Sequence, residues 1–249
     1  MSRLLHNAVF KALTERPARR NDTVLWVSDL GRNPYTTVRR LLTGELEPFD
    51  YPTQLKMDGG NAIEAFTLRQ VAENLGRPIQ TQFPLFNDIW VGYADLVIGH
   101  GTEDVIIYDH KASCGKWWDY KGVLPRSADC CQVWQYGQLY RDRFGVEPRL
   151  GLYYRGWGAW GEFQIEVVTP PDGKSYIQAT GIVTDEKGLE EYEVVRIRYV
   201  DPTLLRNELE MSYVLVKEGQ LTTDDLEAMA PAGPDWDYAE DATERLRAI

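Results

Sequence analysis

An aspartate and a lysine, Asp109 and Lys111, lie two residues apart just after the apolar run Val105–Ile107. Side chains two residues apart point to the same face of a strand, so a strand here presents Asp109 and Lys111 together. Placing these charges among apolar residues is costly unless they bind a ligand or stay solvated. The pair is therefore a candidate for chemistry, with a plain salt bridge as the alternative.

A second acidic residue lies on the preceding apolar run. Ile89–Ile98 and Val105–Ala112 are rich in β-branched and aromatic residues, and Gly99–Glu103 between them is typical of a hairpin connection. Such a hairpin brings Asp95 opposite Asp109 to within about two residues. Converging carboxylates suit Mg²⁺ or Mn²⁺, and these cations promote attack of water on a phosphodiester.

A third carboxylate comes from a predicted helix. An apolar stripe predicts this helix from about Gly60 to Leu75, with Gly76 as its stop. Glu64 lies about one turn after Gly60, where a glycine lets the helix backbone approach the sheet. We expect the Glu64 carboxylate to reach the same cation, and Lys111 to orient or activate the attacking water.

The other elements alternate between helix and strand. Ser28 is predicted to cap a helix from about Asp29 to Gly44, and Ser127 to open another that runs to Phe144. The later predicted elements are the strands Leu150–Arg155, Glu162–Thr169, Tyr176–Thr184 and Tyr192–Val200, and a helix over Pro202–Lys217. This pattern predicts an α/β fold with a central mixed β-sheet flanked by helices and an added C-terminal β-hairpin region.

Charge is distributed unevenly along the chain. The net charge is −11, yet residues 1–44 carry eight basic and three acidic residues, whereas residues 222–249 carry eight acidic and two basic. A basic N-terminal face can meet phosphates in an otherwise acidic protein; solvated helix faces are the alternative. We divide the chain into an N-terminal basic helical segment (1–50), a core (51–218) and an acidic, mobile tail (219–249).

Two classes of protein are excluded by composition. No run of about 18 apolar residues and no secretory signal is present, so we expect a cytoplasmic protein without a membrane partner. The cysteines, Cys114, Cys130 and Cys131, cannot supply the four thiolates of an iron–sulfur cluster. We therefore expect no such cluster, and we expect Cys130 and Cys131 to be small buried hydrophobes on the third helix.

Four segments in order resemble the RecB-like branch of the PD-(D/E)XK nucleases, over roughly residues 58–155. The segments are Gly60-Asn61-Ala62-Ile63-Glu64, Gly92-Tyr93-Ala94-Asp95-Leu96-Val97-Ile98, Ile107-Tyr108-Asp109-His110-Lys111-Ala112-Ser113 and Gln132-Val133-Trp134-Gln135-Tyr136. The resemblance implies a PD-(D/E)XK restriction-endonuclease-like core and metal-dependent DNA cleavage. CRISPR-adaptation and AddB-type relatives carry cluster cysteines that this chain lacks.

The resemblance also implies a role for each matching residue. The implied Mg²⁺ or Mn²⁺ ligands are Glu64, Asp95, Asp109 and the main-chain carbonyl of His110. Lys111 would act at the attacking water. Gln132 and Tyr136, one helical turn apart, would flank the site and contact substrate or position Lys111. The branch often has a histidine where this chain has Glu64.

Aromatic and basic residues directly after the Asp-x-Lys pair are further candidates for contact with nucleic acid. Trp117 and Trp118 could stack on unpaired bases beside the charge of Lys116, with core packing as an equal alternative. The histidine side chains show no metal-ligand spacing, and we assign none of them a catalytic role.

The candidate site predicts a Mg²⁺- or Mn²⁺-dependent nuclease. The resemblance to the RecB-like branch, with its cluster-free phage-type exonucleases, implies that it is an exonuclease of DNA recombination, repair or phage DNA processing in a bacterial or phage-infected cell. The alternatives are a structure-selective endonuclease or RNase of the same fold, and a non-catalytic nucleic-acid-binding module. DNA is the expected partner. A recombination or replication protein that binds the acidic tail is a further hypothesis.

Overall fold

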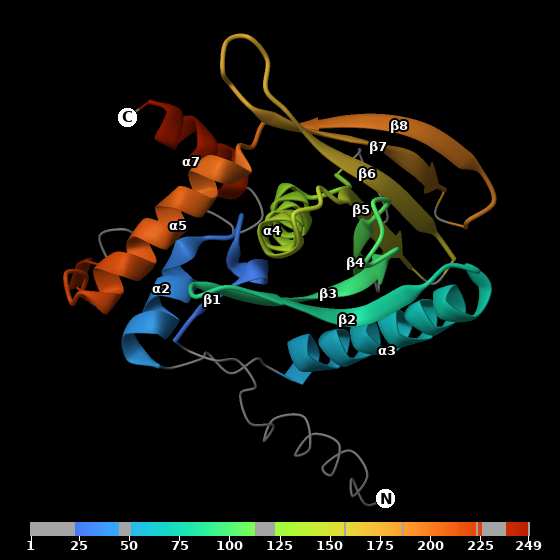
Figure 1. Ribbon diagram of the computed structural model, residues 1–249, viewed down its shortest axis with the longest axis horizontal. Helices are drawn as coiled ribbons and strands as arrows, with labels where there is room; N and C mark the ends of the chain where they lie inside the picture. The colour runs from blue at the N-terminus through green and yellow to red at the C-terminus, as the bar shows by residue number, and fades with distance from the viewer. Residues whose placement is uncertain are drawn as a thin grey trace, which may run out of the picture.

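A computed structural model describes residues 23–44, 51–112, 123–156, 158–185, 187–222, 224–225 and 238–248, with residues 51–55 described by their backbone alone. These residues form an α/β protein in which helices flank a mixed eight-stranded sheet (Figure 1). The helices are η1 (Val27–Asp29, 3-10), α2 (Pro34–Thr43), α3 (Tyr51–Asn74), α4 (Ser127–Phe144), α5 (Pro202–Lys217) and α7 (Tyr238–Arg247). The strands are β1 (Leu25–Trp26), β2 (Ile79–Phe86), β3 (Trp90–Ile98), β4 (Ile106–Ala112), β5 (Arg149–Arg155), β6 (Trp160–Val168), β7 (Tyr176–Thr184) and β8 (Glu191–Arg198).

The sheet has the strand order β1-β3-β4-β5-β6-β7-β8, and β2 also pairs with β3. Strands β4 and β5 are parallel, and α4 supplies the crossover that a parallel pair requires. From β5 to β8 the strands are antiparallel neighbours, so the predicted C-terminal hairpin region continues the same sheet. Helices α3 and α4 lie on opposite sides of β2 and β3 (Figure 1).

Helix α4 lies at the centre of the core. Every residue from Asp129 to Tyr140 is buried, because the sheet covers one side of the helix and η1, α5 and α7 pack around the other. Cys130 and Cys131 are fully buried free thiols, which confirms the expectation for these two. Cys114 lies outside the described residues.

The N-terminal part of the chain differs from the predicted separate helical segment. The expected cap at Ser28 is wrong: α2 begins at Pro34, and Asn33 caps it by accepting a hydrogen bond from Tyr35 N at 2.9 Å. The described residues 23–44 belong to the main body, since Leu25 and Val38 are buried in its core. Residues 1–22, which carry five of the eight basic residues of the segment 1–44, lie outside the described residues, as do residues 45–50.

Two elements of the core differ from the prediction. Helix α3 begins at Tyr51 rather than near Gly60, so the Gly59-Gly60 pair lies within the helix and does not start it. Strand β2 was not among the predicted strands, and it contains Pro84, a residue that argues against a central strand. Among the described residues β2 pairs with β3 alone, so β2 is an edge strand, and a proline is tolerated on an edge strand.

The expectation of a mobile tail over residues 219–249 is wrong for residues 238–248. They contain α7, which packs on α4 and α5 with Ala239, Ala242 and Thr243 almost completely buried. Tyr238 Oη and Arg245 also donate hydrogen bonds to Glu208 on α5, at 3.1 and 2.7 Å. The C-terminal segment is therefore part of the fold.

The packing of α7 predicts that a charge at Ala242 destabilises the whole protein. Ala242→Glu would bury a carboxylate in the core and should lower the Tm by roughly 5–10 °C. Glu244→Ala, on the exposed side of the same helix, is the matched control and should leave the Tm within about 1 °C. Equal melting of both variants in calorimetry would show that α7 does not dock in solution.

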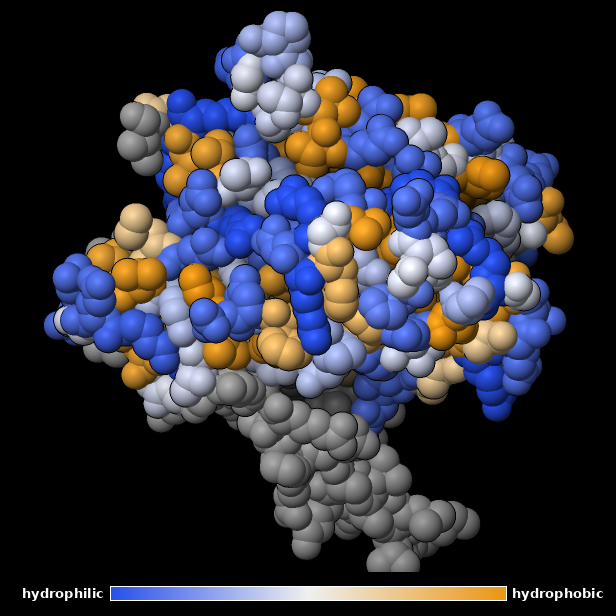
Figure 2. All heavy atoms as spheres, viewed as in Figure 1, coloured by the Kyte–Doolittle hydropathy of each residue, from blue (hydrophilic) through white to orange (hydrophobic). Residues whose placement is uncertain are grey.

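The outer surface carries mixed polarity. On the face shown in Figure 2, hydrophilic residues fill most of the middle, and apolar residues are scattered between them. In the described part of the chain, no helix is long and apolar enough to cross a bilayer.

Candidate active site

The candidate site lies where β3 and β4 stop pairing. Their register runs Ile98↔Ile106, Val97↔Ile107 and Leu96↔Tyr108, so Asp95 and Asp109 are the next residues in line. Instead of a further ladder pair, the Asp95 carboxylate accepts a 2.7 Å hydrogen bond from the backbone N–H of His110. This confirms the expected approach of Asp95 to the Asp-x-Lys strand.

The face of the sheet to which alternate side chains of β3 and β2 point changes at the same place along the strands. Ala94 packs in the main core beneath α4, whereas Leu96, two residues on, packs in the small cluster beneath α3. On β2, Phe83 packs against the main core, whereas Ile79 packs against the small cluster. Residues two apart in a regular strand share a face, so both strands are distorted between these positions, at Asp95 and its partner across the sheet.

Asp109 and Lys111 project together from β4 toward α4, as predicted. Lys111 Nζ lies 2.6 Å from Asp109 Oδ2 and donates a 2.9 Å hydrogen bond to Gln132 Oε1 on α4. Gln132 Nε2 in turn donates to Asp109 Oδ1 at 3.1 Å. Asp109 is 1% exposed, so this closed ring of three side chains holds a carboxylate and an ammonium inside the protein.

Behind Lys111 lies a buried acid that the sequence analysis missed. Asp129 Oδ1 is 3.9 Å from Lys111 Nζ, and Asp129 also accepts hydrogen bonds from Arg126 and from Tyr154 Oη at 2.6 Å. These partners, with Lys111, keep the pKa of Asp129 below its ordinary value in spite of burial. Its place one helical turn before Gln132 was the available signal, because the two side chains share a helix face.

Tyr136 is buried against the sheet beside Gln132. Gln132 Nε2 donates to Tyr136 Oη at 3.4 Å, and the Tyr136 ring lies where a Cβ on Gly92 would meet it at 2.7 Å. Gly92 of the second matching segment is therefore required by the close approach of Tyr136. Since Gln132 and Tyr136 are both more than nine-tenths buried, their geometry favours positioning of Lys111 over contact with substrate.

Glu64 reaches the site from α3, on the other side of the sheet. Gln82 Nε2 on β2 donates to Glu64 Oε1 at 2.9 Å and to Asp95 Oδ1 at 3.0 Å, so one amide bridges the two carboxylates. Gly60 lies near Ala112, but a Cβ there would meet it at 3.5 Å, an ordinary contact. The helix approaches the sheet as expected, although not so closely that Gly60 must be glycine.

The three carboxylates raise one another's proton affinity. Burial, with the charge of Glu64, raises the pKa of Asp95 to about 6. Burial raises the pKa of Asp109 to about 7, with Asp95 adding to the rise and Lys111 opposing it. The pKa of Glu64 is also raised, by burial and then by Asp109. A concentration of negative charge of this kind favours binding of a cation.

The donor chemistry fits a hard divalent cation. Carboxylate oxygens are the ligands such cations prefer, and among the described residues the contact of buried Asp109 Oδ2 is its ion pair with Lys111 at 2.6 Å. As they stand, no three His, Cys, Asp or Glu side chains among the described residues are arranged to hold a metal ion. Shared coordination of one cation would therefore require these side chains to rearrange.

The backbone of His110 faces the region between β3 and β4 where the two strands no longer pair. The N–H and C=O of one strand residue face the same side, so the His110 carbonyl shares the side of the N–H that binds Asp95. This direction is compatible with the implied main-chain ligand. The His110 ring points to the other face of the sheet, as predicted, and burial lowers its pKa to about 4.

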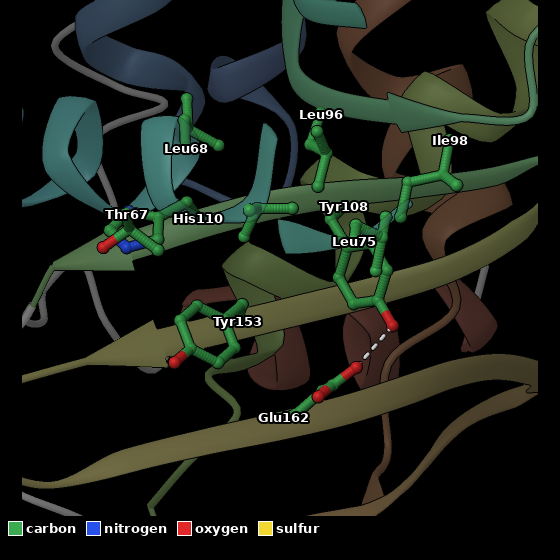
Figure 3. Close-up of a pocket in the computed structure, with 10 residues that line it drawn as sticks. Thr67, Leu68, Leu75, Leu96, Ile98, Tyr108, His110, Tyr153 and Glu162 are labelled. Atoms are coloured by element: carbon green, nitrogen blue, oxygen red, sulfur yellow. Dashed lines mark hydrogen bonds between the residues drawn. The ribbon is translucent and has the colours of Figure 1, made fainter. Parts of the chain in front are cut away.

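The His110 ring lines a cavity of about 230 Å³ between α3 and the sheet (Figure 3). The remaining wall is mainly apolar, with a hydrogen bond from Tyr108 Oη to Glu162 at one side. Glu64, Asp95, Asp109 and Lys111 are not among the residues that line it. The cavity is thus distinct from the charged site.

Lys116, Trp117 and Trp118, the predicted nucleic-acid contacts, lie outside the described residues. The structure brings together the other predicted side chains, from α3, β3, β4 and α4. The chain matches no known protein-family model, and a search of curated proteins finds none with detectable sequence similarity.

Proposed function

We propose that this protein is a divalent-metal-dependent nuclease with the PD-(D/E)XK fold, close to its RecB-like branch, which cleaves DNA as an exonuclease. The observation that carries the proposal is the convergence of Glu64, Asp95 and Asp109, each from a different element, beside a lysine. A salt bridge between Asp109 and Lys111 alone would not explain two further carboxylates in a region where each carboxylate raises the pKa of one of the others.

The residues that would hold the cation are Glu64, Asp95, Asp109 and the His110 carbonyl. When bound, Mg²⁺ or Mn²⁺ supplies Lewis-acid stabilisation of the negative charge that develops on the phosphate, and it lowers the pKa of water. The chain contributes fixed positions for these oxygens, since β4 and β3 are anchored in the core on either side of the gap.

Lys111 is the cation that the chain itself supplies. Burial opposes its charge, but Asp109 and Asp129 raise its pKa above the ordinary lysine value, so the side chain is an ammonium at neutral pH. An ammonium cannot accept a proton from water. We therefore assign Lys111 the role of a donor that orients the attacking water and stabilises the phosphate.

A second positive group lies at the rim of the site. Arg155 ends β5 beside Ala112, its guanidinium is 5.4 Å from the Phe66 ring of α3, and its charge lowers the pKa of His110. Arg155 can therefore contact a substrate phosphate near the end of β4. This local positive charge supports binding of a polyanion by a chain whose net charge is −11.

One assay tests the proposal directly. End-labelled linear DNA and closed circular DNA are incubated with Mg²⁺, with Mn²⁺ or with EDTA. We expect release of nucleotides from linear DNA with either cation, an intact circle, and no cleavage in EDTA. Cleavage of the circle would assign an endonuclease instead, and cleavage of RNA alone an RNase.

A protein that binds DNA but cleaves none of these substrates in any condition would be a non-catalytic binding module. In that case calorimetry measures whether the parent protein binds Mn²⁺. Binding would indicate an enzyme whose substrate was not supplied, and no binding would indicate a non-catalytic module.

A further inference from the structure

A strained glutamine joins two of the proposed metal ligands. Gln82 has φ = +50°, and no other non-glycine residue in the described part of the chain has a positive φ. This left-handed conformation is costly for a residue with a Cβ, and such strain persists only where surrounding interactions enforce it. The strain at Gln82 therefore calls for a functional explanation.

The sheet pairing shows what the conformation achieves. Thr81 pairs with Leu96 and Phe83 with Ala94, so Gln82 lies level with Asp95, at the point where both strands reverse their alternation. A regular strand would keep one alternation throughout. The distortion instead leaves the Gln82 amide able to reach Asp95 and Glu64 together.

The amide occupies a position that suits a positive group. It donates from one nitrogen to two carboxylates, at 2.9 and 3.0 Å, and so offsets part of their mutual repulsion. A carboxylate oxygen has more than one lone pair, so a hydrogen bond alone does not prevent it from binding a metal ion. A cation held between Glu64 Oε1 and Asp95 Oδ1 would however need the space that Gln82 Nε2 fills between these two oxygens, so the amide and the cation compete for one position.

We infer that Gln82 is a positioning residue that holds Glu64 to Asp95 in the metal-free protein and competes with the divalent cation for the position between their oxygens. The inference rests on the proposed metal-dependent function. The Gln82 amide connects Glu64 on α3 to Asp95 on β3, so it helps to set the position of the Glu64 carboxylate. Gln82 thus keeps the site assembled before the metal arrives.

Competition predicts the direction of change of two linked quantities, the Tm of the metal-free protein and its affinity for Mn²⁺. Gln82→Ala removes the amide and keeps a Cβ at the strained position, so the metal-free protein loses two hydrogen bonds and should melt about 2–4 °C lower in EDTA. In saturating Mn²⁺ the metal replaces these bonds, and the difference in Tm should shrink to less than about 1 °C. Because the four states form a closed cycle, Mn²⁺ must then bind Gln82→Ala roughly fivefold more tightly than the parent.

Two further variants serve as controls. Gln80→Ala removes an exposed amide from the same strand without removing a bond to Glu64 or Asp95, and it should change neither Tm nor Mn²⁺ affinity. Gln82→Gly removes the same amide but relieves the strain, because glycine adopts positive φ readily. It should therefore melt higher than Gln82→Ala in EDTA while binding Mn²⁺ with the same affinity.

Calorimetric titration with MnCl₂ and thermal melting on these four proteins separate the possible results. Tighter binding by both Gln82 variants supports competition. Equal binding by parent and variants overturns the inference and leaves the proposed function standing, and weaker binding would show instead that Gln82 assists the metal. Absence of Mn²⁺ binding to the parent overturns the proposed function itself.

Discussion

Lys111→Met should lower the rate of DNA cleavage by roughly 10²-fold or more while Mn²⁺ binding is kept. Methionine retains much of the apolar stem but removes the ammonium that faces Asp109 and Gln132. The carboxylates remain, and loss of a repelling cation should leave Mn²⁺ affinity equal or higher. Single-turnover cleavage at saturating Mn²⁺, with calorimetry alongside, measures the two effects separately.

The matched control is Lys174→Met, in the exposed turn before β7, which should cleave at the parent rate. Asp129 keeps its hydrogen bonds from Arg126 and Tyr154 in the Lys111 variant, so the fold should survive, and melting checks this. Cleavage by Lys111→Met at the parent rate would show that this strand is not catalytic. The pair would then be a structural salt bridge.

Elements with strong local signals could be predicted from the sequence. Helices α4 and α5 begin and end at the predicted residues, and the expected approach of Asp95 to Asp109 is present. Their apolar periodicity and flanking turns are encoded within each segment. The same local signal placed Asp109 and Lys111 on one face of a strand.

Features that depend on distant partners were not predictable. The role of Gln82 arises from pairing of β2 with β3, and nothing near Gln82 in the sequence indicates that its amide lies between Glu64 and Asp95. Helix α7 was not predicted because its buried side chains, one tyrosine, two alanines and one threonine, give little apolar periodicity. In both cases the information lies in the complementary surface, which a local pattern does not contain.

Asp109→Asn should have the largest effect on metal binding, because it removes the charge of the most buried ligand but keeps its shape. Mn²⁺ affinity and cleavage should both fall by roughly 10²-fold or more, and higher Mn²⁺ should restore only part of the rate. Asp129→Asn is the matched control, since it neutralises a buried acid on the other side of Lys111. Its Mn²⁺ affinity should stay within about threefold of the parent value.

The pH dependence of Mn²⁺ affinity provides an independent readout of the same substitution. Burial raises the pKa of Asp109 to about 7, so at pH 6 the carboxyl is mostly protonated and the cation must displace that proton. Parent affinity should therefore rise with pH, by about tenfold between pH 6 and 8 from Asp109 alone. Asp95, with its pKa raised to about 6, contributes only about a further twofold over this range. Asp109→Asn should retain that smaller rise, and an unchanged pH profile in calorimetry would show that Asp109 does not bind the metal.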